Sequence, residues 1–180
     1  MNLHVDYIKF KPLKKALKSI GELLEKDKKE KEIKEALVVL TAVEKCDINV
    51  SSVVKKLVEN VKDIASQVKT KNIVLYPYAH LSKDLGSPEV AQEVLEKAEK
   101  ELAKEKFTVT RAPFGYYKEF ELKVKGHPLS ELSREIRIDG EKEKGEKESN
   151  LIKEEVYDYK QLLREISKSK LDSSKLKDND

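Results

Sequence analysis

Apolar residues along the chain fall into four short runs that predict β-strands. Residues 36–43 form a continuous apolar run rich in β-branched side chains, which is typical of a central strand covered on both faces. Residues 72–76 predict a second buried strand, which ends at Pro77. Residues 107–110 and 117–125 predict two further strands, and in the last one apolar and charged positions alternate.

Two stretches between these runs carry apolar residues at helical spacing. The first helix is expected to start at a cap formed by Ser51 or Ser52 and to run to about Lys69. The second starts at residues 87–89, where a serine cap is followed by proline and glutamate. The apolar stripes consist of Val54, Leu57, Val58, Val61, Ile64, Ala65 and Val68 in the first helix, and of Val90, Val94, Leu95, Ala98 and Leu102 in the second.

The amino-terminal segment completes the predicted fold. Residues 1–5 and 7–13 predict two short strands separated by a turn at Asp6. The Lys/Glu-rich residues 14–32 are compatible with a partly helical segment or with a loop. The order strand, helix, strand, helix, strand predicts an α/β fold in which helices pack on a β-sheet.

The carboxy-terminal part differs in composition from the rest. Residues 139–150 contain no large apolar side chain, so they are expected to form a charged linker. Residues 151–171 regain apolar positions at helical spacing, which predicts a helical extension over residues 151–180. We therefore expect a main domain over residues 1–138, followed by a connection toward a further domain.

Composition narrows the class of protein. The chain has 180 residues, 38% hydrophobic and 39% charged, which suffices for one core and a densely charged surface. A net charge of +3 excludes a protein that coats nucleic acid, so a nucleic-acid partner needs a local patch. The single cysteine, Cys46, excludes an internal disulfide and is expected to be a small core residue. Because neither a membrane-spanning run nor a signal segment is visible, we expect a cytoplasmic protein without a membrane partner.

Lys118 is the first candidate for chemistry. In the strand over residues 117–125 it shares a face with Phe120, Leu122 and Val124, which is expected to be the core face. A partly desolvated lysine must pair with a carboxylate, meet a polar ligand oxygen, or lose its proton more readily. The structural alternative is a lysine whose stem lies on the rim of the core and whose amine reaches water.

Histidines supply the next candidates. His80 follows a buried strand, and the carboxyl ends of sheet strands are a common ligand site. A histidine that bonds backbone in a loop is the alternative. His127 is read as structural, and Glu131, four residues later, is placed on the same face of a short helix. Since no compact ligand spacing exists, we expect no metal site.

Turn residues flank these side chains. Pro77, Pro113, Phe114 and Gly115 interrupt strand pairing, so their backbone groups can point into a pocket as well as form turns. The sequence contains no Gly-rich phosphate loop, no Gly-x-Ser-x-Gly elbow and no Cys-His nucleophile pattern. It therefore offers neither a cofactor motif nor an obvious nucleophile.

Taken together, three tracts resemble the amino-terminal editing domain of archaeal threonyl-tRNA synthetase. They are residues 76–82 (YPYAHLS), residues 112–118 (APFGYYK) and residues 126–134 (GHPLSELSR), and the similarity extends over about residues 1–138. The resemblance implies a fold like that of D-aminoacyl-tRNA deacylase, a homodimer, and removal of serine mischarged onto threonine tRNA. It implies no cofactor for editing.

The resemblance also implies roles for individual residues. Lys118 is expected to position the substrate and the attacking water, with His80, Tyr117 and Glu131 in supporting catalytic roles around the adenosine and seryl groups. Backbone groups near Val43, Pro77, Ala79, Phe114 and Gly115 are expected to line the substrate pocket. The terminal ribose hydroxyl of the tRNA is expected to assist the reaction.

Two departures from the family pattern bear on these expectations. Val5 stands where the family often has serine, which removes a side-chain hydrogen bond from consideration. The chain also lacks class II synthetase motifs, so the catalytic domain is expected in cis or in trans. Two alternatives stay open: a D-aminoacyl-tRNA deacylase, and a non-catalytic module for tRNA binding or dimerisation.

Overall fold

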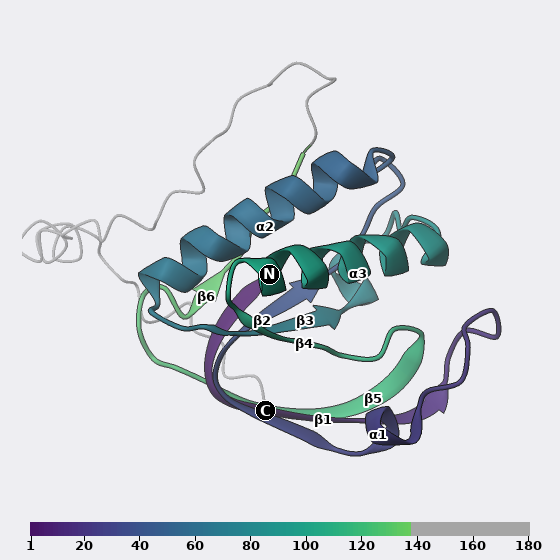
Figure 1. Cartoon of the computed structure of the whole chain (residues 1–180), viewed down its shortest axis with the longest axis horizontal. Helices are drawn as coiled ribbons and strands as arrows, with labels where there is room; N and C mark the ends of the chain where they lie inside the picture. The colour runs from purple at the N-terminus through teal and green to yellow at the C-terminus, as the bar shows by residue number, and fades with distance from the viewer. Residues whose placement is uncertain (138–180) are drawn as a thin grey trace, which may run out of the picture. The chain divides into compact units, whose positions relative to one another are not determined.

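The computed structural model describes residues 1–137, which form one curled sheet with helices on one face (Figure 1). The strands are β1 (Asn2–Lys15), β2 (Lys31–Thr41), β3 (Asn72–Pro77), β4 (Thr108–Arg111), β5 (Tyr116–Val124) and β6 (Glu131–Leu132). The helices are α1 (Glu25–Lys28), α2 (Val50–Gln67) and α3 (Pro88–Lys104), with one 3-10 turn, η1 (Ala79–Leu81). The mixed α/β class expected from the sequence is confirmed.

The sheet combines parallel and antiparallel pairs in the order β4-β3-β2-β1-β5, with β6 also pairing with β1. Parallel neighbours need a crossover, and α2 and α3 provide the two crossovers that join β2 to β3 and β3 to β4. The antiparallel strands β1, β5 and β6 complete the sheet. The carboxyl ends of β2 and β3 therefore meet at one edge, where Thr41 pairs with Pro77.

The helix-covered face of the sheet carries the larger core. Side chains of α2 and α3 pack on alternate residues of β2 and β3, which point to this face because strand side chains alternate. Figure 1 shows the two helices side by side over the sheet. The stripes expected from sequence are the buried ones, for example Val61 and Ile64 in α2 and Val94 and Ala98 in α3. Both helices are thus held mainly by their amphipathic faces.

The opposite face has a second core formed by β1, β2 and β3, with Ile8 and Phe10 almost fully buried. The register between β1 and β5 shifts between Val5 and Tyr7, and Glu35 in the neighbouring strand β2 has a positive φ of 47°. Such irregularities increase local twist and bend a sheet. The strands β1 and β2 curve strongly in Figure 1.

Several local expectations need correction. The expectation of a turn at Asp6 is wrong. β1 is one strand of 14 residues, and only its pairing is irregular at this position. Between β1 and β2 the only helical residues are those of α1, and β2 begins at Lys31, before the apolar run. The cap of α2 is Asn49, whose side chain accepts the Ser52 N–H at 3.1 Å, and not Ser51 or Ser52.

Three further residues lie in other surroundings than expected. Cys46 is exposed in the loop after β2 and is not a core residue. Glu131 belongs to strand β6 and not to a short helix, because residues 131–132 pair with the start of β1. The face that Lys118 shares is only partly buried, since Phe120 is 45% exposed.

The chain divides into a unit over Met1–Asp139 and a second over Gly140–Asp180. The linker and helical extension expected over residues 139–150 and 151–180 lie outside the described residues. Within residues 1–137, none of the helices combines the length and apolarity that crossing a bilayer would require.

Candidate active site

Lys118 lies in β5 with its amine turned back toward the loop that precedes the strand. Its Nζ donates to the carbonyl oxygens of Pro113 and Tyr116, both at 2.9 Å. The same Nζ lies 5.2 Å from the centroid of the Tyr76 ring. Burial lowers the pKa of Lys118 to about 8. The residue is thus a partly desolvated amine bound by backbone oxygens, and within residues 1–137 its amine bonds to no carboxylate.

The loop before β5 is held by a backbone hydrogen bond at Ala112 and by the conformation of Gly115. Ala112 is buried, and its N–H donates to the Leu75 carbonyl at 2.9 Å, which continues the β4 pairing into the loop. Gly115 has φ +72°, a conformation that favours glycine. A Cβ at Gly115 would lie 2.2 Å from Ile20 Cδ1. This turn fixes where the carbonyl oxygens of Pro113 and Tyr116 point, and so fixes Lys118.

Tyr76 supports Lys118 from β3. Tyr76 is not among the residues expected to act in the site, and its contacts have no local signal in the sequence because they join three strands. Its ring meets the rings of Phe10, Tyr78 and Phe120 at centroid distances of 6.0, 6.4 and 5.5 Å. Burial raises the pKa of the Tyr76 hydroxyl to about 12, so the phenol stays neutral. The aromatic cluster gives the amine of Lys118 a rigid apolar support.

Pro77 ends β3, and Ala79 and His80 follow it at the same edge of the sheet. The Tyr78 N–H donates to the Thr41 carbonyl at 2.8 Å, which ties this segment to the end of β2. His80 is exposed, and its ring lies 5.5 Å from the Tyr78 ring, edge-on. The backbone at this edge therefore comes from β2 and β3 together, as expected for the carboxyl ends of neighbouring parallel strands.

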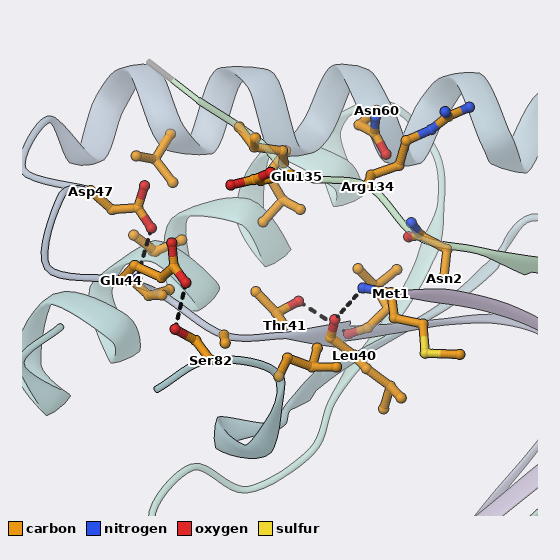
Figure 2. A pocket seen from close by; sticks show the side chains of 18 of the residues that line it. Met1, Asn2, Leu40, Thr41, Glu44, Asp47, Asn60, Ser82, Arg134 and Glu135 are labelled. Carbon is orange, nitrogen blue, oxygen red and sulfur yellow. Dashed lines mark hydrogen bonds between the residues drawn. The ribbon is translucent and has the colours of Figure 1, made fainter. Parts of the chain in front are cut away.

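At the same edge of the sheet, Val43 lines a cavity of about 350 Å³. The cavity opens between the sheet and α2 (Figure 2). Polar groups that line it are held by local hydrogen bonds. Glu44 accepts from the Ser82 hydroxyl, and the Glu44 N–H donates to Asp47 at 2.9 Å. The amino terminus of Met1, which is not among the residues expected from the sequence, donates to the Leu40 carbonyl of β2 at 2.9 Å.

The cavity shares only one residue with the expected pocket. Val43 lines it, whereas Lys118, His80, Pro77 and Ala79 do not. Phe114 packs partly buried against the helix-side core, which brings it toward this side of the sheet. The residues that were expected to line one pocket therefore lie on two sides of the carboxyl ends of β2 and β3.

Two expected catalytic residues lie apart from Lys118 in this chain. Tyr117 is 57% exposed and points to the opposite face of β5, because neighbours in a strand alternate; Lys14 Nζ lies 5.5 Å from its ring. Glu131 pairs with Leu3 of β1, whereas Lys118 pairs with Pro12. Nine residues of strand separate these positions, which is on the order of 30 Å along a strand.

Metal ligands are not grouped in the described part of the chain. Among residues 1–137, no three His, Cys, Asp or Glu side chains lie close enough to hold a metal ion. The candidate site brings together the amine of Lys118, backbone carbonyl groups and the neighbouring aromatic rings.

The curled sheet with two helices on one face has the D-aminoacyl-tRNA deacylase-like fold. The structure is similar to the c-Myc DNA Unwinding Element Binding Protein, with a TM-score of 0.50 and 10% sequence identity. The similarity covers 68% of this chain and 89% of that chain, and it concerns the fold alone.

Sequence comparison gives the family. Residues 1–136 match the archaea-specific editing domain of threonyl-tRNA synthetase, and the chain belongs to this family. The resemblance stated from the three tracts is confirmed.

The relatives are longer proteins. The chain is 47% identical to the threonine–tRNA ligase of Thermococcus sibiricus over 164 residues, covering 89% of this chain and 26% of the relative. It is 51% identical to that of Methanobrevibacter smithii over 135 residues, covering 74% of this chain and 22% of the relative. The chain thus spans about a quarter of the length of these relatives.

Proposed function

We propose that this chain is a proofreading hydrolase that removes L-serine from mischarged seryl-tRNA(Thr) and spares threonyl-tRNA(Thr). The observation that carries the proposal is Lys118, whose amine is held by the carbonyls of Pro113 and Tyr116 at a strand edge. A desolvated amine fixed by two acceptors is suited to binding a polar substrate group. Membership of the editing-domain family supports the choice of an aminoacyl ester as substrate.

In the proposed reaction, water attacks the carbonyl carbon of the seryl ester and the ester bond to the terminal ribose breaks. The adjacent ribose hydroxyl assists by orienting the water, and Lys118 holds the substrate and the water in place. Two directions around Nζ are taken by the carbonyls of Pro113 and Tyr116, so a remaining one faces the substrate. The proposed reaction needs no cofactor.

The proposed site distinguishes serine from threonine by the size of the side chain. One missing methyl group is worth only ~1–3 kcal/mol in a hydrophobic pocket, so a synthetase site that accepts threonine cannot reject serine strongly. A second site that excludes the threonine methyl removes the error. Backbone at the ends of β2 and β3, near Val43, Pro77 and Ala79, is tied into the parallel pairing and is therefore stiff enough for such a test.

Tyr117 and Glu131 motivate the proposed homodimer. Tyr117 is exposed on the face of β5 opposite to Lys118, and Glu131 lies at the other end of β1. A second copy of the chain can bring these two side chains beside the Lys118 of the first. The proposed partners are thus a second copy, the acceptor end of tRNA(Thr), and a synthetase catalytic domain in cis or in trans, all in the cytoplasm.

The test compares hydrolysis of Ser-tRNA(Thr) and Thr-tRNA(Thr) by the wild-type chain, Lys118→Met and a control, Lys71→Met. Lys71 is an exposed residue just before β3, at the opposite end of that strand from Pro77. The proposal expects loss of serine, retention of threonine, and a large drop in rate in Lys118→Met only. Hydrolysis of neither ester would refute it in favour of a binding module. Cleavage of a D-aminoacyl-tRNA instead of Ser-tRNA(Thr) would indicate a chirality-checking deacylase.

A further inference from the structure

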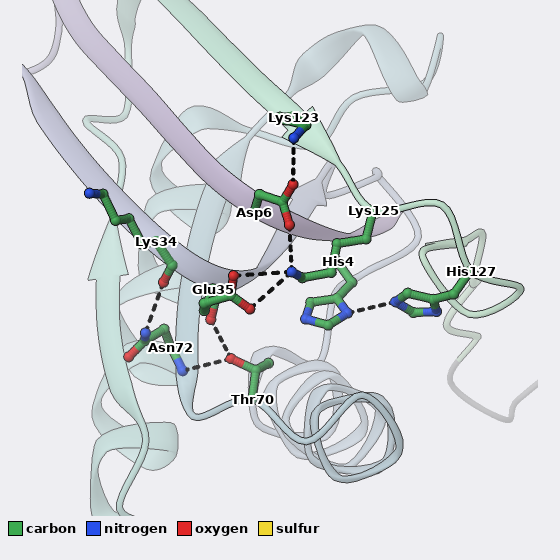
Figure 3. A network of polar contacts seen from close by, with 9 residues as sticks. All are labelled: His4, Asp6, Lys34, Glu35, Thr70, Asn72, Lys123, Lys125 and His127. Carbon is green, nitrogen blue, oxygen red and sulfur yellow. Dashed lines mark hydrogen bonds and ion pairs between the residues drawn. The ribbon is translucent and has the colours of Figure 1, made fainter.

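Two of the three histidines of the chain meet away from the candidate active site. His4 is a buried residue of β1 with 7% of its surface exposed, and His127 lies in the turn that follows β5. His4 Nδ1 and His127 Nε2 are 2.8 Å apart, and the ring planes are inclined by 66° (Figure 3). This distance corresponds to a hydrogen bond between the imidazoles.

The hydrogen-bond pattern fixes the tautomers of both rings. The Leu129 N–H donates to His127 Nδ1 at 3.2 Å, so this nitrogen is an acceptor and carries no proton. A neutral imidazole with an acceptor Nδ1 has its proton on Nε2, which then donates to His4 Nδ1. His4 in turn carries its proton on Nε2. A second proton on either ring sets a donor against a donor, so the arrangement requires two neutral rings.

The pair joins β1 to the segment that carries Glu131. The His4 N–H donates to the Ser130 carbonyl at 2.8 Å, and the Ser130 N–H donates to the His127 carbonyl at 2.9 Å. Glu131 follows directly and pairs with Leu3 in β1. The side-chain bond thus reinforces the backbone bonds that lay residues 126–132 along the start of β1.

Charged groups from three segments lie near His4. The amine of Lys125, just after β5, is 2.5 Å from Asp6 in β1 and 3.0 Å from Glu35 in β2 (Figure 3). Burial lowers the pKa of His4, and His127 and Lys125 act in the same direction, while Glu35 and Asp6 oppose them. The surroundings therefore favour the neutral ring that the hydrogen-bond pattern requires.

We propose that His127 is a positioning residue: through its bond to His4, and only while both rings are neutral, it holds residues 126–132 and with them Glu131. The consequence for catalysis rests on the proposed editing reaction, in which Glu131 takes part. The pairing itself does not depend on that function, and acid is expected to release it.

The first experiment is NMR on the whole chain labelled with ¹⁵N-histidine. At pH 7.5 both rings should carry their proton on Nε2. His127→Phe keeps a ring but removes the donor, so amide exchange of His4 and Ser130 should rise about five- to tenfold, the effect expected for one neutral hydrogen bond. His127→Gln, which keeps an N–H donor, should restore protection, and His80→Phe is the control for loss of an exposed histidine. A proton on His127 Nδ1, or unchanged exchange in His127→Phe, overturns the proposal.

The second experiment measures hydrolysis of Ser-tRNA(Thr) between pH 5.5 and 7.5. His127→Phe should be slowed roughly ten- to hundredfold at pH 7.5, as expected for a displaced catalytic group, and His127→Gln should recover most of the rate. Faster exchange with an unchanged rate would refute the positioning of Glu131. If the wild type hydrolyses nothing, the proposed function fails, whereas the NMR results still decide whether the histidine pair exists.

Discussion

Replacement of Lys118 by Met tests whether burial of the charged amine of Lys118 lowers the free energy of unfolding. The folded-state pKa of Lys118 is about 8, while an unperturbed lysine has 10.5. This difference corresponds to about 3 kcal/mol. Because the side chain is only partly buried, solvent screening reduces the effect, and we expect roughly 1–2 kcal/mol.

The sign follows from proton binding. Between pH 8 and pH 10.5 the unfolded chain binds more protons at Lys118 than the folded chain, so the free energy of unfolding rises with pH in this window. Below pH 8 both states are protonated and the cost of burying the charge is fully present. The free energy of unfolding of the wild type should therefore rise by roughly 1–2 kcal/mol relative to that of Lys118→Met between pH 7 and pH 10.

Urea unfolding of the wild type, Lys118→Met and the exposed control Lys71→Met, at several pH values, measures this directly. Taking differences to a matched variant removes the contribution of the other tyrosines and lysines that titrate in the same range. A stability difference that stays constant from pH 7 to pH 10 would refute the reasoning. It would mean that the amine of Lys118 is hydrated and that its bonds to the Pro113 and Tyr116 carbonyls do not exclude water.

Two further substitutions test the local structure around the site. Gly115→Ala should destabilise the chain by about 1–3 kcal/mol and impair hydrolysis, because φ is +72° and a Cβ would lie 2.2 Å from Ile20; thermal unfolding together with the Ser-tRNA(Thr) assay checks both effects. Ser87→Ala removes the acceptor for the Val90 N–H at the start of α3 and should cost about 1 kcal/mol while leaving hydrolysis intact. An unchanged melting temperature in either variant would contradict the role assigned to that residue.

The helices illustrate how much of the fold was predictable. The start of α3 at Ser87 and Pro88 was correct, because the cap and the proline act within one turn. The cap of α2 was misplaced by two or three residues, since asparagine and serine side chains compete for the same amide groups. The single strand β1 was split in two at Asp6, because an irregularity in pairing has the same local signal as a turn.

By itself, the sequence determined the α/β class, the buried stripes of α2 and α3, and the family, because periodicity and short motifs are local properties. It also singled out Lys118 through the two-residue alternation of β5. Only the tertiary structure decided what Lys118 touches, since the Pro113 and Tyr116 carbonyls and the Tyr76 ring come together through pairing across several strands.

The position of Glu131 was likewise decided by the tertiary structure. Spacing along the chain placed it beside His127 on a helix, whereas pairing with β1 makes it part of a strand and moves it far from Lys118. The bond between His4 and His127 joins residues 123 positions apart and has no signal in either local sequence. Contacts of this kind depend on which strands become neighbours, and that is settled by burial of the whole sheet rather than by any one segment.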